Sequence, residues 1–253
     1  MDFLLVGILG SLWGSFANVC IYRLPLKEGV VKGRSFCPKC KKKIFWYENI
    51  PILSYLFLGG KCSKCKKKIS SQYLLVETIS TISFLIIYYF FGISLTSILL
   101  MILFLSFLII FFIDLKHYII PNILTFPMMV LGFVKSFDPN LNPIFPNYTN
   151  SLIGGIFGYL IIWTIILFYK KIRNKEGMGL GDAKLLAVIG FWFGWVSIPF
   201  IIFLSSTIAL IIVIPDLLKK SKKLSSQIPF GPYIIIGTIA YLLFQNKLVN
   251  LFL

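Results

Sequence analysis

Charged side chains, and acidic ones above all, are scarce in this sequence. Only 13% of the 253 residues are charged, and nine acids stand against 25 lysines and arginines. By contrast, 58% of the residues are hydrophobic and the mean hydropathy is +0.88. A soluble core of this size does not need so many apolar side chains. The composition therefore argues against a soluble domain and favours an integral membrane protein of spanning helices.

The first apolar stretch is not expected to be a cleavable signal peptide. The first stretch, MDFLLVGILGSLWGSFANVC, lacks a basic start, and no small-residue cleavage site follows it, so we expect a retained first helix. The sequence predicts an all-α polytopic membrane protein of about eight transmembrane helices. The sixth segment is short, so a seven-helix count is the main alternative. The eight segments run roughly over 2–23, 73–92, 95–115, 119–135, 150–170, 183–196, 198–218 and 232–251.

Basic residues are almost absent from every second connection between these segments. The segment 24–72 holds 12 lysines and arginines against Glu28 and Glu48, whereas the connection SFDPNLNPIFPNYTN contains neither lysine nor arginine. The positive-inside rule then places 24–72 in the cytoplasm and predicts a multi-pass protein of the cytoplasmic (plasma) membrane. The net charge of +16 is explained by this topology and by anionic lipid headgroups, so we expect no nucleic-acid partner.

Four of the five cysteines form two pairs inside this basic loop. Cys37 and Cys40 lie in CPKC, Cys62 and Cys65 lie in CSKC, and 21 residues separate the two pairs. Four thiolates at this spacing can surround one tetrahedral Zn²⁺, and they leave no open position for a substrate, which predicts a structural zinc ribbon. A redox dithiol, or two pairs that bind nothing, is the alternative. Cys20 is expected to be a packed small residue.

Two carboxylates fall at the same predicted depth in the membrane. Asp114 ends the third apolar segment, and Asp182 begins the sixth, in GMGLGD. A carboxylate inside the bilayer costs about 2.5–3.5 kcal/mol, so two at one level indicate a shared site. The alternative is that Asp182 is a helix N-cap and Asp114 a partner for Lys116 or His117. Glu77, near the start of the second segment, would also be costly to bury without a partner.

The order of the motifs along the chain resembles the type IV prepilin peptidase family, a group of GxGD-type membrane aspartic proteases. The resemblance covers nearly the whole chain. It rests on GSFANVCIYRLP, the two cysteine pairs with ENIPILSYL between them, SSQYLLVE, IDLKHYIIPN, GMGLGDAKLLA and IPFGPYI. The chain departs from many relatives at Lys116 and Asn122, where those relatives carry acids. No glycine-rich fingerprint for a nucleotide-like cofactor is present.

The resemblance implies a bifunctional enzyme with Asp114 and Asp182 as its catalytic pair. It would cleave the leader of prepilin or pseudopilin substrates and then methylate the new N-terminus with S-adenosyl-L-methionine. The implied domains are a first transmembrane helix (1–23), a cytoplasmic zinc loop associated with methyl transfer (24–72) and a transmembrane protease domain (73–253). The alternatives are a peptidase without methyl transfer and, from another class, a proton or ion transporter that uses its membrane carboxylates.

The glycines of GMGLGD carry a structural prediction of their own. Glycine tolerates a positive φ and lets other groups approach closely, so Gly177, Gly179 and Gly181 are expected to form a tight turn that brings Asp182 to Asp114. Two neighbouring carboxylates cannot both ionise easily, so the pair is expected to share one proton.

Overall fold

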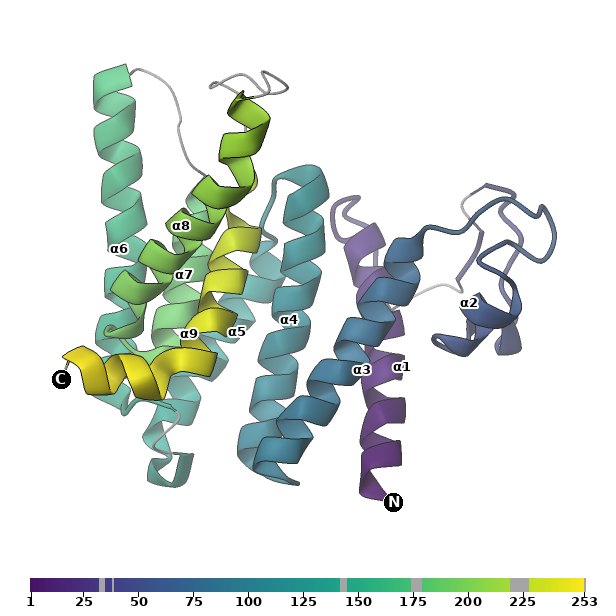
Figure 1. Ribbon diagram of the computed structural model, residues 1–253, viewed down its shortest axis with the longest axis horizontal. Coiled ribbons are helices and arrows are strands. Elements are labelled where there is room, and N and C mark those ends of the chain that lie inside the picture. The colour runs from purple at the N-terminus through teal and green to yellow at the C-terminus, as the bar shows by residue number, and fades with distance from the viewer. Residues whose placement is uncertain (32–34, 38, 142–144, 174–178, 219–227, 253) are drawn as a thin grey trace. The chain divides into compact units, whose positions relative to one another are not determined.

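The structure is a computed structural model that describes the chain except for residues 32–34, 38, 142–144, 174–178, 219–227 and 253 (Figure 1). The chain divides into two compact units, Met1–Ile109 and Ile110–Leu253. The boundary falls inside helix α4, and each unit is described by itself. The predicted domain limits at residues 23 and 72 stay a prediction. Gly177 and the basic cluster that begins at Lys219 lie outside the described residues.

The described chain contains eight separate apolar helices, which confirms the predicted all-α membrane fold. The seven-helix alternative fails because Gly194 ends α7 with a φ of 80°, before α8 begins. Five of these helices, α1, α3, α4, α6 and α8, are long and apolar enough to cross a membrane, so the chain is a multi-pass membrane protein. The eight helices are α1 (Asp2–Arg23), α3 (Ser71–Phe91), α4 (Leu95–His117), α5 (Asn122–Val134), α6 (Tyr148–Arg173), α7 (Leu180–Phe193), α8 (Ser197–Leu218) and α9 (Gly231–Phe252).

In the first unit, α1 and α3 pack closely as an antiparallel pair. The Cβ of an alanine at Gly10 would lie 2.9 Å from the Thr81 backbone, and one at Gly14 would lie 2.8 Å from the Glu77 backbone. Further along, the Phe3 ring meets the Tyr88 ring edge-on. Small residues four apart allow this approach, as is typical of helix pairs in membranes. We refer to this contact surface as the α1–α3 seam.

The loop between α1 and α3 forms no sheet within its described residues. Its regular structure is the short helix α2 (Leu53–Phe57) and a 3₁₀ turn, η1 (Tyr47–Asn49). Two isolated β-bridges, Phe36 with Lys43 and Lys61 with Lys68, each close around one cysteine pair.

In the second unit, α7 is the helix around which the others pack. Its Gly190 meets Gly154 of α6 so closely that neither position has room for a Cβ, because each would clash with the carbonyl oxygen of the other. On the α5 side, the Trp192 indole N–H donates to the Met128 carbonyl at 2.8 Å. The unit also contains the 3₁₀ turns η2 (Lys135–Phe137) and η3 (Pro139–Leu141).

A buried lysine closes the end of α7. Lys135 is 5% exposed, and its ammonium donates to the Trp192 carbonyl at 3.1 Å. Its Nζ also lies 3.8 Å from the centroid of the Phe145 ring. A cation at a helix C-terminus satisfies carbonyls that have no partner within the helix. The sequence placed Lys135 near a membrane face and gave no sign of this role.

Two alanine substitutions in α1 test the seam. Gly14→Ala should destabilise the protein by about 1–3 kcal/mol, because the new Cβ meets the backbone of α3. At Gly7 the nearest atom to a new Cβ is a Leu85 methyl at 3.7 Å, so Gly7→Ala should be neutral or slightly stabilising. Thermal unfolding of the purified protein in detergent measures both. Equal losses of stability would contradict the close approach at Gly14.

Candidate active site and metal centre

Asp114 lies in the last turn of α4 and is only 4% exposed. Its Oδ2 accepts a hydrogen bond of 3.1 Å from the backbone N–H of Gly231, the first residue of α9. No side chain fits at Gly231, because a Cβ there would lie 2.7 Å from the same oxygen. The N-terminus of α9 therefore fixes the position of the carboxylate, and helix N-termini favour negative charge.

Asp182 lies in the first turn of α7 and is 8% exposed. The N-cap residue is Gly179, so the interpretation of Asp182 as the N-cap itself is wrong. The Asp182 carboxylate instead reaches back from the third helical position to the Gly179 backbone N–H. This contact is one half of a capping box, in which the acid at the third position satisfies the N–H of the cap residue.

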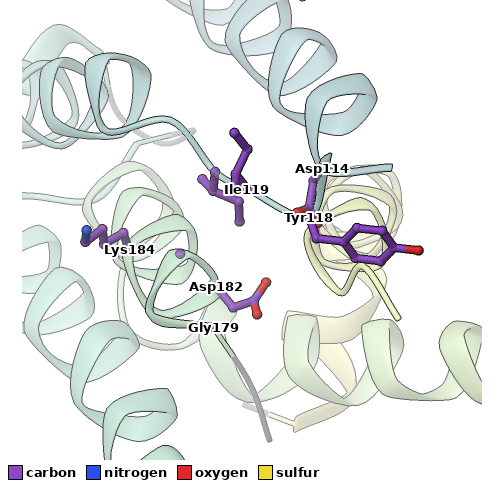
Figure 2. Close-up of a pocket in the computed structure, with 8 residues that line it drawn as sticks. Asp114, Tyr118, Ile119, Gly179, Asp182 and Lys184 are labelled. Atoms are coloured by element: carbon purple, nitrogen blue, oxygen red, sulfur yellow. The ribbon is translucent and has the colours of Figure 1, made fainter. Parts of the chain in front are cut away.

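The two aspartates line one pocket of about 230 Å³. Figure 2 shows the Asp182 carboxylate pointing toward the side of the pocket where Asp114 and Tyr118 lie. The connection between α4 and α5 and the start of α7 supply the walls. The structure therefore brings the end of α4 and the beginning of α7 to one pocket, whereas the predicted common depth in the membrane stays a prediction. The lining residues are Asp114, Tyr118, Ile119, Ile120, Gly179, Gly181, Asp182 and Lys184.

The glycines before Asp182 act differently from the prediction. Gly179 has a φ of −83°, and Gly181 lies inside α7, so neither uses a positive φ. Gly177 lies outside the described residues. Gly181 is needed for close approach, since a Cβ there would lie 3.0 Å from the Ile120 Cβ. The start of α7 and the chain after α4 thus meet closely because one glycine removes a side chain.

Sequence reasoning missed two residues of this site. Gly231 belongs to IPFGPYI, one of the motifs that carry the family resemblance. Nothing else in the sequence pointed to its contact with Asp114. Lys184 of α7 lines the same pocket, and its ammonium donates to Asn122 Oδ1 at 2.9 Å. Asn122 is one of the two positions where the chain departs from many relatives, so a neutral amide holds Lys184 here. His117, by contrast, is exposed at the end of α4, as expected.

The four cysteines of the loop converge on one point in the first unit. Their sulfur atoms all lie within 4.8 Å of one another, with Cys37 and Cys65 at 4.0 Å and Cys40 and Cys62 at 3.9 Å. A Zn–S bond of about 2.3 Å in a tetrahedron places sulfurs about 3.8 Å apart. The cluster therefore has the donor set and dimensions of a closed tetrahedral metal site. Cys20 is buried in α1, as expected of a packed residue.

The two cysteine pairs repeat the same backbone turn. The Cys37 N–H donates to Lys42 and the Lys41 N–H donates to Cys37, at 2.9 and 2.8 Å. The second pair repeats this with Cys62, Lys67 and Lys66, at 3.0 Å for each bond. Lys41 and Lys66 both have a φ of 55°. Two turns with one geometry aim their sulfurs at a common centre.

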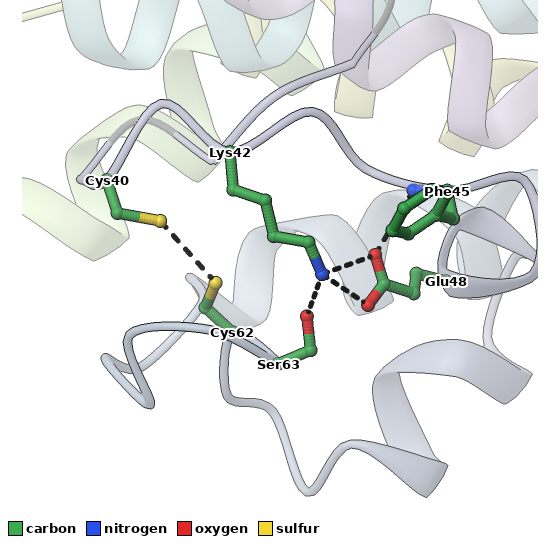
Figure 3. A network of polar contacts seen from close by, with 6 residues as sticks. All are labelled: Cys40, Lys42, Phe45, Glu48, Cys62 and Ser63. Carbon is green, nitrogen blue, oxygen red and sulfur yellow. Dashed lines mark hydrogen bonds and ion pairs between the residues drawn. The ribbon is translucent and has the colours of Figure 1, made fainter.

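Polar contacts of Lys42 join the first cysteine turn to Glu48 and to the second turn (Figure 3). The Lys42 ammonium donates to both Glu48 oxygens, at 2.8 and 3.2 Å, and to the Ser63 hydroxyl at 2.7 Å. Glu48 accepts hydrogen bonds from the Lys42 ammonium, the Ser63 hydroxyl and the Phe45 N–H, and these bonds lower the pKa of its carboxyl group to about 2. These polar contacts stabilise the loop beside the cysteine cluster. The sequence did not predict this role for Glu48.

The thiols of the cluster do not ionise alike. Backbone N–H groups of Cys65 and Lys64 lower the pKa of the Cys62 thiol to about 6. The Lys42 N–H lowers the pKa of Cys40, but burial and the three neighbouring sulfurs outweigh it and leave that pKa at about 11. A metal ion bound here would offset the charge of the four thiolates.

Comparison with known proteins relates nearly the whole chain to one family. Residues 8–91 match the Bacterial Peptidase A24 N-terminal domain, and residues 101–214 match the Type IV leader peptidase family. A protein from Pseudomonas aeruginosa named prepilin leader peptidase/N-methyltransferase is 34% identical over 97% of this chain and 91% of its own length. Proteins of the same name from Stutzerimonas stutzeri and Neisseria gonorrhoeae are 34% and 33% identical over 97% and 92% of this chain. No solved structure matches the chain.

The fold and the paired acids define a multi-pass membrane protein with a buried two-carboxylate pocket. The chain belongs to the type IV leader peptidase family.

Replacement of Gly231 tests how Asp114 is held. Gly231→Ala should lower cleavage of a prepilin-like peptide by about tenfold or more, because the new Cβ displaces the Asp114 carboxylate. Gly179→Ala should cost much less, since a Cβ there lies 3.8 Å from Asp182 Oδ2, an ordinary contact. The measurement is the rate of product formation by mass spectrometry. A full rate for Gly231→Ala would contradict the role of the α9 N-terminus.

Proposed function

We propose that this chain is a membrane endopeptidase that cleaves the leader of prepilin-like proteins and then N-methylates the new N-terminus. The observation that carries the peptidase function is the pocket lined by Asp114 and Asp182, which are 4% and 8% exposed and come from different helices. The names of its relatives support both activities and favour neither the peptidase-only nor the transporter alternative.

The mechanism follows from two carboxyl groups at one site. Like charges so close cannot both ionise easily, so the pair shares one proton. The ionised carboxylate takes a proton from a water molecule, whose oxygen attacks the scissile carbonyl. The protonated partner donates a hydrogen bond to the carbonyl oxygen as negative charge develops there. The pair acts as a unit, so the proton is assigned to the pair and not to either aspartate.

Each aspartate is held ready for this role by a backbone N–H. Gly231 at the start of α9 holds Asp114, and Gly179 at the start of α7 holds Asp182. Such donors keep an ionised carboxylate in place without adding a cation that would neutralise it. Lys184, the cation that lines the pocket, is bonded to Asn122.

The cysteine cluster is proposed to hold one structural Zn²⁺. The four thiols supply a soft, closed donor set that suits zinc and leaves no coordination position for a substrate. Bound zinc would join the two turns and help to fold a polar loop that has little apolar core. S-adenosyl-L-methionine would supply the methyl group for the second reaction. The lysine distribution supports a cytoplasmic position for the loop and the pocket.

Asparagine at either aspartate tests the peptidase mechanism. Asp114→Asn and Asp182→Asn should each lower cleavage of a prepilin-like peptide by about 1,000-fold or more, and the double variant should be little worse than either single one. Methylation of a pre-cleaved peptide should persist in all three proteins. Mass spectrometry with and without the methyl donor measures both reactions. Near-normal cleavage by Asp182→Asn would contradict this mechanism, because the role of Asp182 would then be limited to its capping contact with Gly179.

Removal of one sulfur tests the metal site. The purified protein should contain one Zn²⁺ per chain, and Cys62→Ser should lose it, because three thiolates do not close the tetrahedron. Cys20→Ser is the matched control and should keep the metal. Elemental analysis together with limited proteolysis of the loop measures the outcome. A zinc-free protein whose loop resists proteolysis would contradict a structural metal.

A further inference from the structure

A buried carboxylate of the first unit has no part in the chemistry described so far. Glu77 lies in α3 and is 7% exposed. Its Oε2 accepts a short hydrogen bond of 2.7 Å from the backbone N–H of Ile52, and the Ser15 hydroxyl of α1 also donates to it. Both of these donors are neutral, so neither balances the charge of the buried carboxylate. Buried carboxylates are ordinarily paired with a cation.

The same seam holds a second acceptor that has no partner at all. Asn18 of α1 is 4% exposed, and its side-chain N–H donates to the Tyr73 carbonyl at 3.0 Å. Its Oδ1 is buried and has no hydrogen-bond partner among the described residues. A flipped amide would set this oxygen against the Tyr73 carbonyl, so the orientation is fixed. An unpaired buried acceptor costs about 1–3 kcal/mol, and such groups in folded proteins call for an explanation.

The antiparallel register brings these two acceptors close together. Asn18 lies at the level of Tyr73, and Gly14 lies at the level of Glu77. Gly14 and Asn18, like Tyr73 and Glu77, are one helical turn apart, so the two levels are separated by about 5 Å along the seam. The loop segment above them contains Ile52, a β-branched residue with a φ of 62°. Such a backbone conformation is strained for a β-branched residue, and Ile52 adopts it while its N–H donates to Glu77.

We infer that Glu77 and Asn18 form the binding site for the N-terminal amine that is methylated. The inference rests on the methyl transfer of the proposed function. The Glu77 carboxylate and Asn18 Oδ1, the two groups assigned to the ligand, are both acceptors, and a primary ammonium offers three N–H groups and a positive charge. The ammonium takes the place of the Ile52 N–H at the Glu77 carboxylate and supplies the missing donor for Asn18 Oδ1.

Glu77 also provides the proton acceptor that the reaction needs. An ammonium nitrogen has no lone pair, so it must first lose a proton, which passes to the Glu77 carboxylate. The freed lone pair then forms the new N–C bond, and the electron pair of the methyl–sulfur bond stays on the donor sulfur. The product is a methylammonium, and the Glu77 proton leaves to water. No oxidant, reductant or metal enters this balance.

The pH dependence of methyl transfer tests Glu77. With a methyl-labelled donor and an apolar peptide that has a free N-terminus, Glu77→Gln should lower transfer by about 100-fold or more near pH 6.5. The deficit should shrink by about tenfold per pH unit toward pH 8, since such amines lose their own proton at about pH 7.7–8.0. Peptide cleavage should stay within about twofold, because the two aspartates belong to the other unit.

The hydrogen-bond donors to Glu77 do not contribute to the pH dependence of methyl transfer in this range. The loop contributes the Ile52 N–H and α1 contributes the Ser15 hydroxyl, and neither titrates in this range. On its own helix, Tyr73 stands one turn earlier, and at the end of α1 Arg23 donates to the Gly29 carbonyl at 3.0 Å. Ser80→Ala is the matched control. Ser80 is buried in the same seam and bonds the Gly10 carbonyl, so its loss should leave transfer within about twofold to threefold.

A binding measurement without the methyl donor tests Asn18. The unaltered protein should bind the free-amine peptide more tightly than the same peptide with an acetylated N-terminus. Asn18→Leu should reduce that preference by about tenfold, while the unfolding temperature stays equal or rises, because an unpaired acceptor is removed. A merely structural role for Asn18 would instead lower the unfolding temperature and leave the preference unchanged.

The outcomes separate the amine site from the proposed function. A Glu77→Gln deficit that is constant with pH, or an equal loss in Ser80→Ala, would overturn the amine site alone. Absence of any preference for the free amine in the unaltered protein would overturn it as well. If the unaltered protein binds the free amine selectively but transfers no methyl group, the amine site stands and the methyltransferase function fails.

Discussion

The cost of burying a carboxylate in an apolar, membrane-spanning chain constrains this structure more than any other interaction. Among the residues that the structure describes, three acids are buried, Glu77, Asp114 and Asp182, and each accepts a hydrogen bond from a backbone N–H. The donors are Ile52, Gly231 and Gly179. A backbone N–H stabilises the ionised form without neutralising it, and its position is fixed by the fold. The acids therefore remain available for chemistry, which a salt bridge with lysine would prevent.

Glycine at the contact points makes this arrangement possible. Gly14 lets α1 approach the backbone of Glu77, Gly181 lets the start of α7 approach Ile120, and Gly231 lets the start of α9 reach Asp114. None of these three glycines has a positive φ. Their common property is a missing side chain. In lipid the hydrophobic effect does not drive helices together, so close backbone packing is what holds a helix pair.

The sequence predicted the helices and the chemical residues, but not the contacts that orient them. Apolar runs separated by lysines were enough for eight helices, because a spanning segment must be long and apolar. The spacing of Cys37, Cys40, Cys62 and Cys65 was enough for their cluster, because a tetrahedral centre needs four sulfurs from short turns. Gly231 could not be assigned, since its contact joins residues 117 positions apart in the chain. Asn18 gave no signal, because an unpaired acceptor becomes visible only when the neighbouring helix is in place.

The glycine turn was predicted wrongly for a physical reason. Several glycines before a carboxylate suggest unusual backbone angles when the segment is considered by itself. The structure shows that Gly179 and Gly181 keep ordinary angles and that the crowding comes from Ile120, on another segment. A glycine's freedom of φ is a local property, whereas its small size matters only against a neighbour. Sequence alone offers no means to choose between these two reasons.

The environment of a carboxylate decides which reaction it can serve. Asp114 and Asp182 line one pocket, so each modifies the charge of the other, and the shared proton supplies an acid and a base together. Peptide hydrolysis needs both at once, one for the water and one for the carbonyl oxygen. Glu77 accepts from two neutral donors, and one turn away lies an amide oxygen that has no partner within the described part of the chain. A lone base beside a further acceptor suits an ammonium that must be held and deprotonated. A single carboxylate cannot have both environments, so an enzyme that performs both reactions needs two separate acidic sites.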